Sequence, residues 1–166
     1  AVIKYFELVK GARVLVLCPK KLGENWLKWL SPGQRNPLAG DRLNYDVLSH
    51  TDLSRTRGKV GKVDLSDISA NYDLIVIDES HNFRNNSVGS ERVDGSFRQT
   101  RYERLMKDLI KPGIRSKVLL LSATPVNNQI QDLRNQISFI AGGDVGRPAD
   151  EANAGRIFLH GHVQTG

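Results

Sequence analysis

The sequence predicts an α/β fold in which a parallel sheet is covered by helices on both faces. Three observations support this prediction: strand-like and helix-like segments alternate, the strand-like segments are apolar throughout, and polar residues gather where they end. Alternation of this kind is typical of parallel sheets, and continuous apolar runs are typical of strands buried on both faces. A chain of 166 residues has the size of one ordinary domain.

The first segments predict a helix, a strand and a second helix. Residues 1–10 carry apolar side chains at helical spacing and stop at Gly11, a common helix terminator. Residues 13–19, RVLVLCP, form a short β-rich run, and residues 20–30 return to a helical period. A loop dense in proline and glycine follows, and YDVLSH at 45–50 is a second plausible strand.

The later segments continue the alternation. The run YDLIVIDE at 72–79 predicts the strongest strand of the chain. Helical periodicity returns at 100–111 and ends at a Pro-Gly pair, and KVLLLSAT at 117–124 predicts the last clear strand. Residues 128–143 place apolar side chains on one helical face before a glycine pair. We expect one lobe over residues 1–143, and a tail or the start of a connection over 144–166.

The composition is that of a globular protein without disulfides or membrane-spanning segments. With 39% apolar and 25% charged residues, the chain resembles an average globular domain and not a disordered or fibrous one. Cys18 is the single cysteine, so no internal disulfide can form, and no apolar run approaches the roughly 20 residues that span a bilayer. We therefore expect a cytoplasmic protein without a membrane partner. The net charge of +6 favours polyanions as partners.

Polar residues follow three of the predicted strands, in CPKK, DESH and SATP. Ligands of parallel α/β sheets bind beyond the carboxyl ends of the strands. Asp78 and Glu79 could hold Mg²⁺ and activate a water there, which suits hydrolysis of a phosphoanhydride. The alternative is that Asp78 caps a turn and Glu79 faces solvent. A site is favoured because His81 follows closely and because Ser122 and Thr124 could bond to the carboxylates.

At these residues the sequence resembles the helicase superfamily 2 ATPases, whose lobes have a RecA-like P-loop NTPase fold. DESH resembles the DExH form of the Walker B motif in that family. The resemblance implies that Asp78 holds the Mg²⁺ bound with ATP, that Glu79 activates the attacking water, and that His81 is a coupling residue. The segments NFRN at 82–85 and LRNQISFI at 133–140 are similar to the Swi/Snf-type DNA translocases within the superfamily.

SATPVNN at 122–128 looks like motif III of the same family. The resemblance implies that Ser122, Ala123 and Thr124 relay the state of the nucleotide to the nucleic-acid side. Together with the other motifs, it implies ATP, duplex DNA and a second RecA-like lobe as partners.

Two further segments resemble nucleic-acid motifs. VLVLCPKKLGENW is similar to motif Ia, which implies a DNA-backbone contact around Pro19 and Lys20. VLSHTDL looks like the next nucleic-acid motif, centred on Ser49, His50 and Thr51. The four motifs occur in the order of the family over residues 13–140.

The sequence departs from the family in one respect. It contains no G-x-x-x-x-G-K-[ST], the loop that holds the phosphates of ATP. The two Gly-Lys pairs, at 58–59 and 61–62, have neither the spacing nor a following hydroxyl. The resemblance implies that the first strand and its phosphate loop precede Ala1. We therefore expect a fragment with negligible ATPase activity, in which strand 117–122 exposes an unpaired edge.

Some alternatives stay open at this point. Trp26 and Trp29 are assigned to packing and not to base stacking, because they share a helical repeat with leucines. A restriction-type or RNA-directed DExH helicase motor would carry similar motifs. A non-catalytic nucleic-acid-binding module is favoured by the absent phosphate loop and opposed by Asp78, Glu79 and the SAT sequence.

Overall fold

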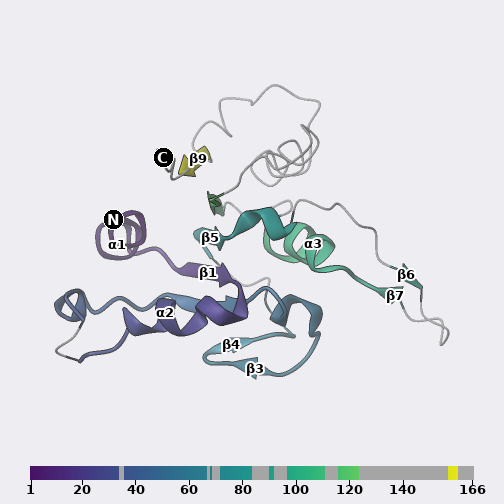
Figure 1. The fold of residues 1–166 in the computed structure, drawn as a ribbon, viewed down its shortest axis with the longest axis horizontal. Coiled ribbons are helices and arrows are strands. Elements are labelled where there is room, and N and C mark those ends of the chain that lie inside the picture. The colour runs from purple at the N-terminus through teal and green to yellow at the C-terminus, as the bar shows by residue number, and fades with distance from the viewer. Residues whose placement is uncertain are drawn as a thin grey trace.

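A five-stranded sheet forms the centre of the molecule (Figure 1). The computed structural model describes residues 1–33, 36–66, 68, 72–83, 90–91, 97–110, 116–123 and 157–160. The strand order is β2-β1-β5-β8-β9, and each neighbouring pair is parallel. The strands are β1 (Val14–Cys18), β2 (Asp46–Ser49), β5 (Leu74–Asp78), β8 (Lys117–Leu121) and β9 (Ile157–His160). The α/β class with a parallel sheet is therefore confirmed.

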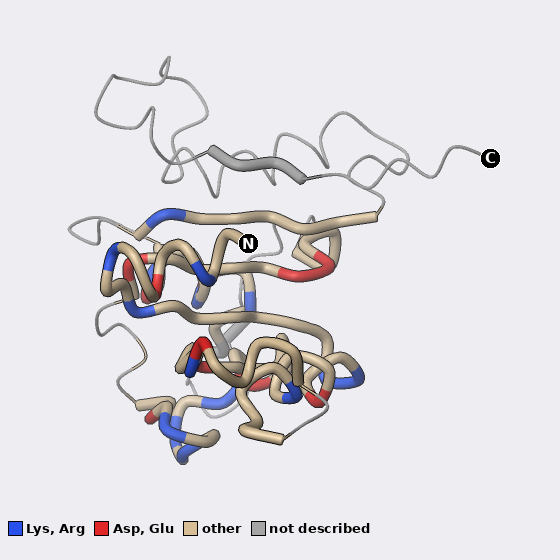
Figure 2. The backbone as a smooth tube through the Cα atoms, turned by 90° about the vertical axis from the view of Figure 1, so that its left-hand side faces the viewer, with Lys and Arg blue, Asp and Glu red and all other residues tan. Residues whose placement is uncertain are grey.

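The central strands are apolar throughout because their two faces enter two separate cores. One core takes Leu15, Leu17, Leu48, Ile75, Ile77, Val118 and Leu120. The other takes the alternate residues Val14, Val16, Cys18, Leu74, Val76 and Leu119. Successive side chains of a strand point to opposite faces, so burial on both faces requires apolar residues at every position. Charged residues of β2, β5 and β8 are confined to the strand ends (Figure 2).

Helices cover both faces, as predicted. On the side of the second core, Ile3, Phe6, Trp26 and Leu30 pack from the first two helical segments. On the side of the first core, the buried residues Leu105, Met106, Leu109 and Ile110 pack from the third. The segments are α1 (Val2–Lys4) with the π-helical η1 (Tyr5–Val9), α2 (Gly23–Lys28), and α3 (Arg101–Arg104) with the π-helical η6 (Leu105–Ile110).

Local signals set the limits of these helices. Gly11 has a φ of +63°, and the Ala12 N–H donates to the Phe6 carbonyl at 3.0 Å, which closes the first helix. Thr100 begins α3 with a capping box: its side chain accepts from the Glu103 N–H at 3.1 Å, and the Glu103 carboxylate accepts from the Thr100 N–H at 2.9 Å.

Shorter elements connect the strands. Four 3₁₀ turns are described, η2 (Lys20–Leu22), η3 (Ala39–Asp41), η4 (Asp52–Ser54) and η5 (Ser80–Phe83). Two small antiparallel pairs join β3 (Lys59–Val60) to β4 (Val63–Asp64) and β6 (Ser90–Glu91) to β7 (Phe97–Arg98). None of the described helices is long and apolar enough to cross a bilayer.

The strand β9 occupies the edge of the sheet beyond β8 (Figure 1). Residues 118–121 pair in parallel register with 157–160, so the predicted unpaired edge at 117–122 is wrong. The partner strand comes from the segment 144–166, where a run of four residues has too little pattern to predict a strand. The helix predicted over 128–143 lies outside the described residues.

Candidate functional site

Four strands of the sheet end at one edge, and the predicted site residues lie at or just after these ends. The register pairs Cys18 with Ser49 and Asp78 with Leu121. Because parallel strands share a direction, their carboxyl ends lie together. The structure therefore brings the ends of β1, β2, β5 and β8 to one place, which we call the carboxyl edge.

Both oxygens of the Asp78 carboxylate are held by donors. The indole Nε1 of Trp26 donates to Oδ2 at 2.9 Å, and the backbone N–H of Glu79 donates to Oδ1 at 3.0 Å. A carboxylate oxygen has two lone pairs, so each oxygen keeps acceptor capacity. The carboxylate is half-buried at the end of β5 and is fixed in orientation.

Glu79 has an unusual backbone. Its φ is +52°, in the left-handed region that residues with a Cβ rarely adopt. Such conformations cost about 1–3 kcal/mol and gather at functional sites.

The Glu79 carboxylate contains a buried oxygen without a hydrogen bond. His81 Nδ1 lies 3.2 Å from both Glu79 Oε2 and Ser122 Oγ. Only the contact with Ser122 has hydrogen-bond geometry, so Oε2 has no hydrogen-bond partner among the described residues. A buried carboxylate oxygen is costly unless it is paired, and a cation or a water would pair it.

Of the predicted motif III residues, Ser122 lies beside His81. The Ser122 hydroxyl bonds to His81, and Ala123 is exposed next to it. Thr124 lies outside the described residues. The structure thus joins Glu79, His81 and Ser122, while their roles stay predictions.

The donor set at the carboxyl edge fits a hard cation. No group of three or more His, Cys, Asp or Glu side chains that could hold a metal is found in the described part of the chain. Mg²⁺ does not need such a cage, because it commonly uses one or two carboxylates together with waters and substrate phosphates. Asp78, with its orientation fixed, meets that requirement, and Glu79 Oε2, which has no hydrogen bond among the described residues, could accept one from a water.

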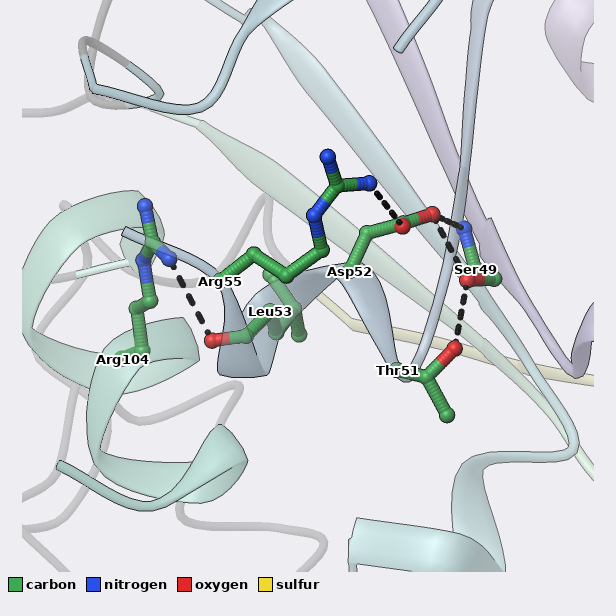
Figure 3. Close-up of polar contacts among 6 residues, drawn as sticks. All are labelled: Ser49, Thr51, Asp52, Leu53, Arg55 and Arg104. Atoms are coloured by element: carbon green, nitrogen blue, oxygen red, sulfur yellow. Dashed lines mark hydrogen bonds and ion pairs between the residues drawn. The ribbon is translucent and has the colours of Figure 1, made fainter. Parts of the chain in front are cut away.

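The predicted nucleic-acid residues 49–51 differ in exposure. Ser49 is half-buried: its N–H and its hydroxyl both donate to Asp52 Oδ2, at 2.9 Å and 2.6 Å (Figure 3). The Thr51 hydroxyl, which is exposed, lies 2.8 Å from Ser49 Oγ. Arg55 holds the second oxygen of Asp52 at 3.3 Å. This network fixes the turn after β2 with the hydroxyl of Thr51 accessible.

His50 lies inside the protein. Its side chain is 4% exposed, and its ring meets the Phe83 ring edge to face at 4.6 Å between centroids. Burial lowers the pKa of His50 to about 4, and a smaller contribution from Arg101 acts in the same direction. Backbone groups of Leu17 and Asp78, and the Asp78 charge, oppose the shift. His50 is therefore neutral near pH 7.

We expect this histidine to make the protein less stable in mild acid. The unfolded chain, with a histidine pKa near 6.5, takes up a proton before the folded chain does. The contribution of His50 is complete above pH 6.5 and is lost as the pH falls toward 4, with about 2 kcal/mol lost between pH 7 and pH 5. Urea unfolding of wild type and His50→Leu at both pH values measures it. Equal pH dependence in the two proteins would contradict the burial of a neutral His50.

Pro19 and Lys20 are at the same edge. Pro19 is half-buried directly after β1, and Lys20 is exposed at the start of η2. Among the described residues, Lys20 and Lys21 are thus exposed cations beside the turn that carries Thr51.

The sequence analysis missed two functional or structural side chains. Trp26 was assigned to packing, and it does pack, but its indole N–H also contacts Asp78. The sequence pattern does not single out Arg104, which is 5% exposed and donates to the carbonyl of Leu53 (Figure 3) and to that of Leu65. For Trp26, the available signal was an indole that can only donate, four residues after Leu22. For Arg104, the local sequence carries no signal of burial.

Comparison with known proteins gives one relative to report. The chain is 26% identical over 139 residues to the uncharacterized ATP-dependent helicase YqhH of Bacillus subtilis (strain 168). The match covers 81% of this chain and 22% of that protein, so the chain spans about a fifth of its relative. No protein-family model matches the sequence. This similarity supports a relationship to helicases, but it does not identify a type of helicase.

Proposed function

We propose, from the helicase likeness and the arrangement at the carboxyl edge, that this chain is part of an ATP-dependent motor that moves along duplex DNA in the cytoplasm. Within the superfamily 2 helicases, the proposal assigns it to the Swi/Snf type. The chain would supply the lobe that handles Mg²⁺ and water, and a second RecA-like lobe would complete the site. A phosphate-binding loop is needed for turnover, and none is present among the 166 residues.

The observation that carries this proposal is how the carboxylates of Asp78 and Glu79 are oriented and hydrogen-bonded. Asp78 is oriented by two donors, and Glu79 has a backbone in the left-handed region and a buried oxygen that contacts His81 but has no hydrogen bond. A solvent-facing glutamate would not have a buried carboxylate oxygen, and a simple capping aspartate would not need the second donor from Trp26. Together they support a site built for a cation and a water.

The residues take distinct roles in the proposed reaction. Asp78 would hold Mg²⁺, which neutralises charge on the phosphates of ATP. Glu79 would accept a proton from the attacking water, because its Oε2 has no hydrogen bond and lies at the same carboxyl edge. His81 lies between Glu79 and Ser122, so a change at the carboxylate reaches β8 through one hydrogen bond. Ser122, Ala123 and Thr124 then pass the nucleotide state toward the DNA side.

The DNA side of the proposal rests on exposed groups. Lys20 and the Thr51 hydroxyl are accessible at the carboxyl edge and suit phosphate contacts. Pro19 and Ser49 shape the two turns. His50 is buried, so it would contribute by supporting the turn after β2 and not by touching DNA.

We expect Lys20→Ala to weaken binding of this chain to duplex DNA. Loss of one phosphate contact lowers the salt slope by about 1 and the affinity several-fold. The matched control is Lys10→Ala, an exposed lysine at the opposite, amino end of β1. Fluorescence anisotropy at several salt concentrations measures both. Equal losses in the two variants would contradict a DNA contact at Lys20, and tighter binding of duplex RNA would favour the RNA-directed motor.

A non-catalytic nucleic-acid-binding module is the second candidate. The lack of G-x-x-x-x-G-K-[ST] favours it. The two candidates differ in one measurement: DNA-stimulated ATP hydrolysis that depends on Glu79, in a protein that carries this chain together with a phosphate-binding loop.

A further inference from the structure

The contact between Trp26 and Asp78 joins two segments that are far apart in the sequence. The indole Nε1 donates to Asp78 Oδ2 at 2.9 Å across 52 positions. An indole N–H can only donate, so it requires an acceptor when it is partly buried. If Asp78 alone held the Trp26 ring in place, the hydrogen bond could be explained simply as a partner for the indole N–H.

Trp26 is instead held by contacts that do not involve Asp78. The buried Tyr45 hydroxyl donates to the Trp26 carbonyl at 2.5 Å, and the two rings meet edge to face at 6.2 Å. Burial, with a smaller contribution from Glu7, raises the pKa of Tyr45 to about 12, so the hydroxyl keeps its proton. The indole is therefore placed by α2 and Tyr45, and the carboxylate takes its orientation from the indole.

The Glu79 N–H completes the arrangement on the other oxygen. With one donor on Oδ2 and one on Oδ1, the plane of the Asp78 carboxylate is fixed, and a lone pair of each oxygen stays available. Partners of this kind orient the groups that bind metals, and losing one costs about 10-fold to 100-fold in metal affinity.

We propose that Trp26 is a positioning residue that holds the Asp78 carboxylate in the orientation in which it binds Mg²⁺. The inference rests on the proposed role of Asp78. Trp26 itself touches neither the cation nor the water. It acts through the carboxylate, and Tyr45 supports it from behind.

The hydrogen bond is tested first, in the 166-residue chain. The protein has two tryptophans, so its ¹⁵N-labelled form gives two indole N–H signals, which Trp26→Phe and Trp29→Phe assign. We expect the Trp26 indole proton to exchange slowly with solvent, and to shift and exchange faster in Asp78→Asn. The Trp29 signal, from a ring that is 37% exposed, is expected to stay unchanged. A Trp26 signal that is unmoved by Asp78→Asn overturns the inference, even if Trp26→Phe does not fold.

The effect on the cation is tested with Mn²⁺, a paramagnetic substitute for Mg²⁺. Broadening of the Glu79 amide signal reports Mn²⁺ at Asp78 in every variant. We expect Trp26→Phe to raise the half-saturating Mn²⁺ concentration about 10-fold, and Trp29→Phe to leave it unchanged. Asp78→Asn should abolish the broadening.

The outcomes separate the inference from the proposed function. Equal Mn²⁺ affinity in Trp26→Phe and wild type, with broadening lost in Asp78→Asn, overturns the positioning role and leaves the cation site standing. No broadening of the Glu79 amide in wild type, with the indole hydrogen bond intact, overturns the magnesium role of Asp78, and the inference is then overturned with it.

Discussion

Glu79→Gln is expected to lower kcat for ATP hydrolysis about 1,000-fold in a protein that joins this chain to a phosphate-binding loop. Glutamine keeps the size of the side chain but cannot accept the proton of the attacking water. ATP binding should change little, because the phosphates and Mg²⁺ are held by other groups. The chain by itself should show negligible hydrolysis, since stabilisation of the transferred phosphoryl group is the larger part of such catalysis.

The substitution is well matched to the local structure. Glutamine at position 79 meets the same backbone cost at a φ of +52° as glutamate does, so the turn is expected to persist. Glu24→Gln, at an exposed position of α2, is the control for a lost surface charge. A steady-state ATPase assay with and without duplex DNA measures all three proteins. Undiminished hydrolysis in Glu79→Gln would contradict the proposed role of the carboxylate.

Arg104→Met is expected to destabilise the chain by about 3 kcal/mol. The Arg104 guanidinium is buried and donates to the Leu53 carbonyl at 3.4 Å (Figure 3) and to the Leu65 carbonyl. Its Nε also lies 3.4 Å from the Asp108 carboxylate. Methionine fills much of the same space but leaves the two carbonyls without this donor.

The backbone carbonyls make this arginine different from a simple buried ion pair. A pair of side chains can be replaced by apolar groups at little cost, but carbonyl groups cannot be removed. Arg101→Met is the control, because Arg101 is exposed at the start of the same helix and should cost less than about 0.5 kcal/mol. Urea unfolding, with the m-value fitted for each protein, compares the free energies of unfolding of wild type, Arg104→Met and Arg101→Met. Equal stability of the two variants would mean that the Arg104 contacts contribute nothing.

The position of Arg104 also links the helix to the proposed DNA side. Leu53 belongs to η4, which directly follows the turn at 49–51. Periodicity showed a helix over 100–111, but Arg104 was ambiguous in the sequence. A charged residue is buried only when fixed acceptors surround it, and those acceptors come from residues 39 and 51 positions away.

The sequence predicted most of the sheet because burial on both faces leaves a local mark. β1 is apolar at every position, and β5 and β8 are apolar except for one charged residue at an end, so the existence and type of these strands could be predicted from periodicity and composition alone. β9 could not, because a four-residue strand at an edge carries too little pattern. Pairing with β8 is what identifies it.

The sequence by itself determined the α/β class, the order of the central segments and the placement of Asp78 and Glu79 directly after a buried strand. Those features follow from the local spacing of apolar and polar residues. Only the tertiary structure decided that Trp26 holds Asp78, that His50 is buried and neutral, and that Arg104 joins α3 to η4. Each of these depends on a partner distant in the chain, and local spacing carries no information about which distant groups meet.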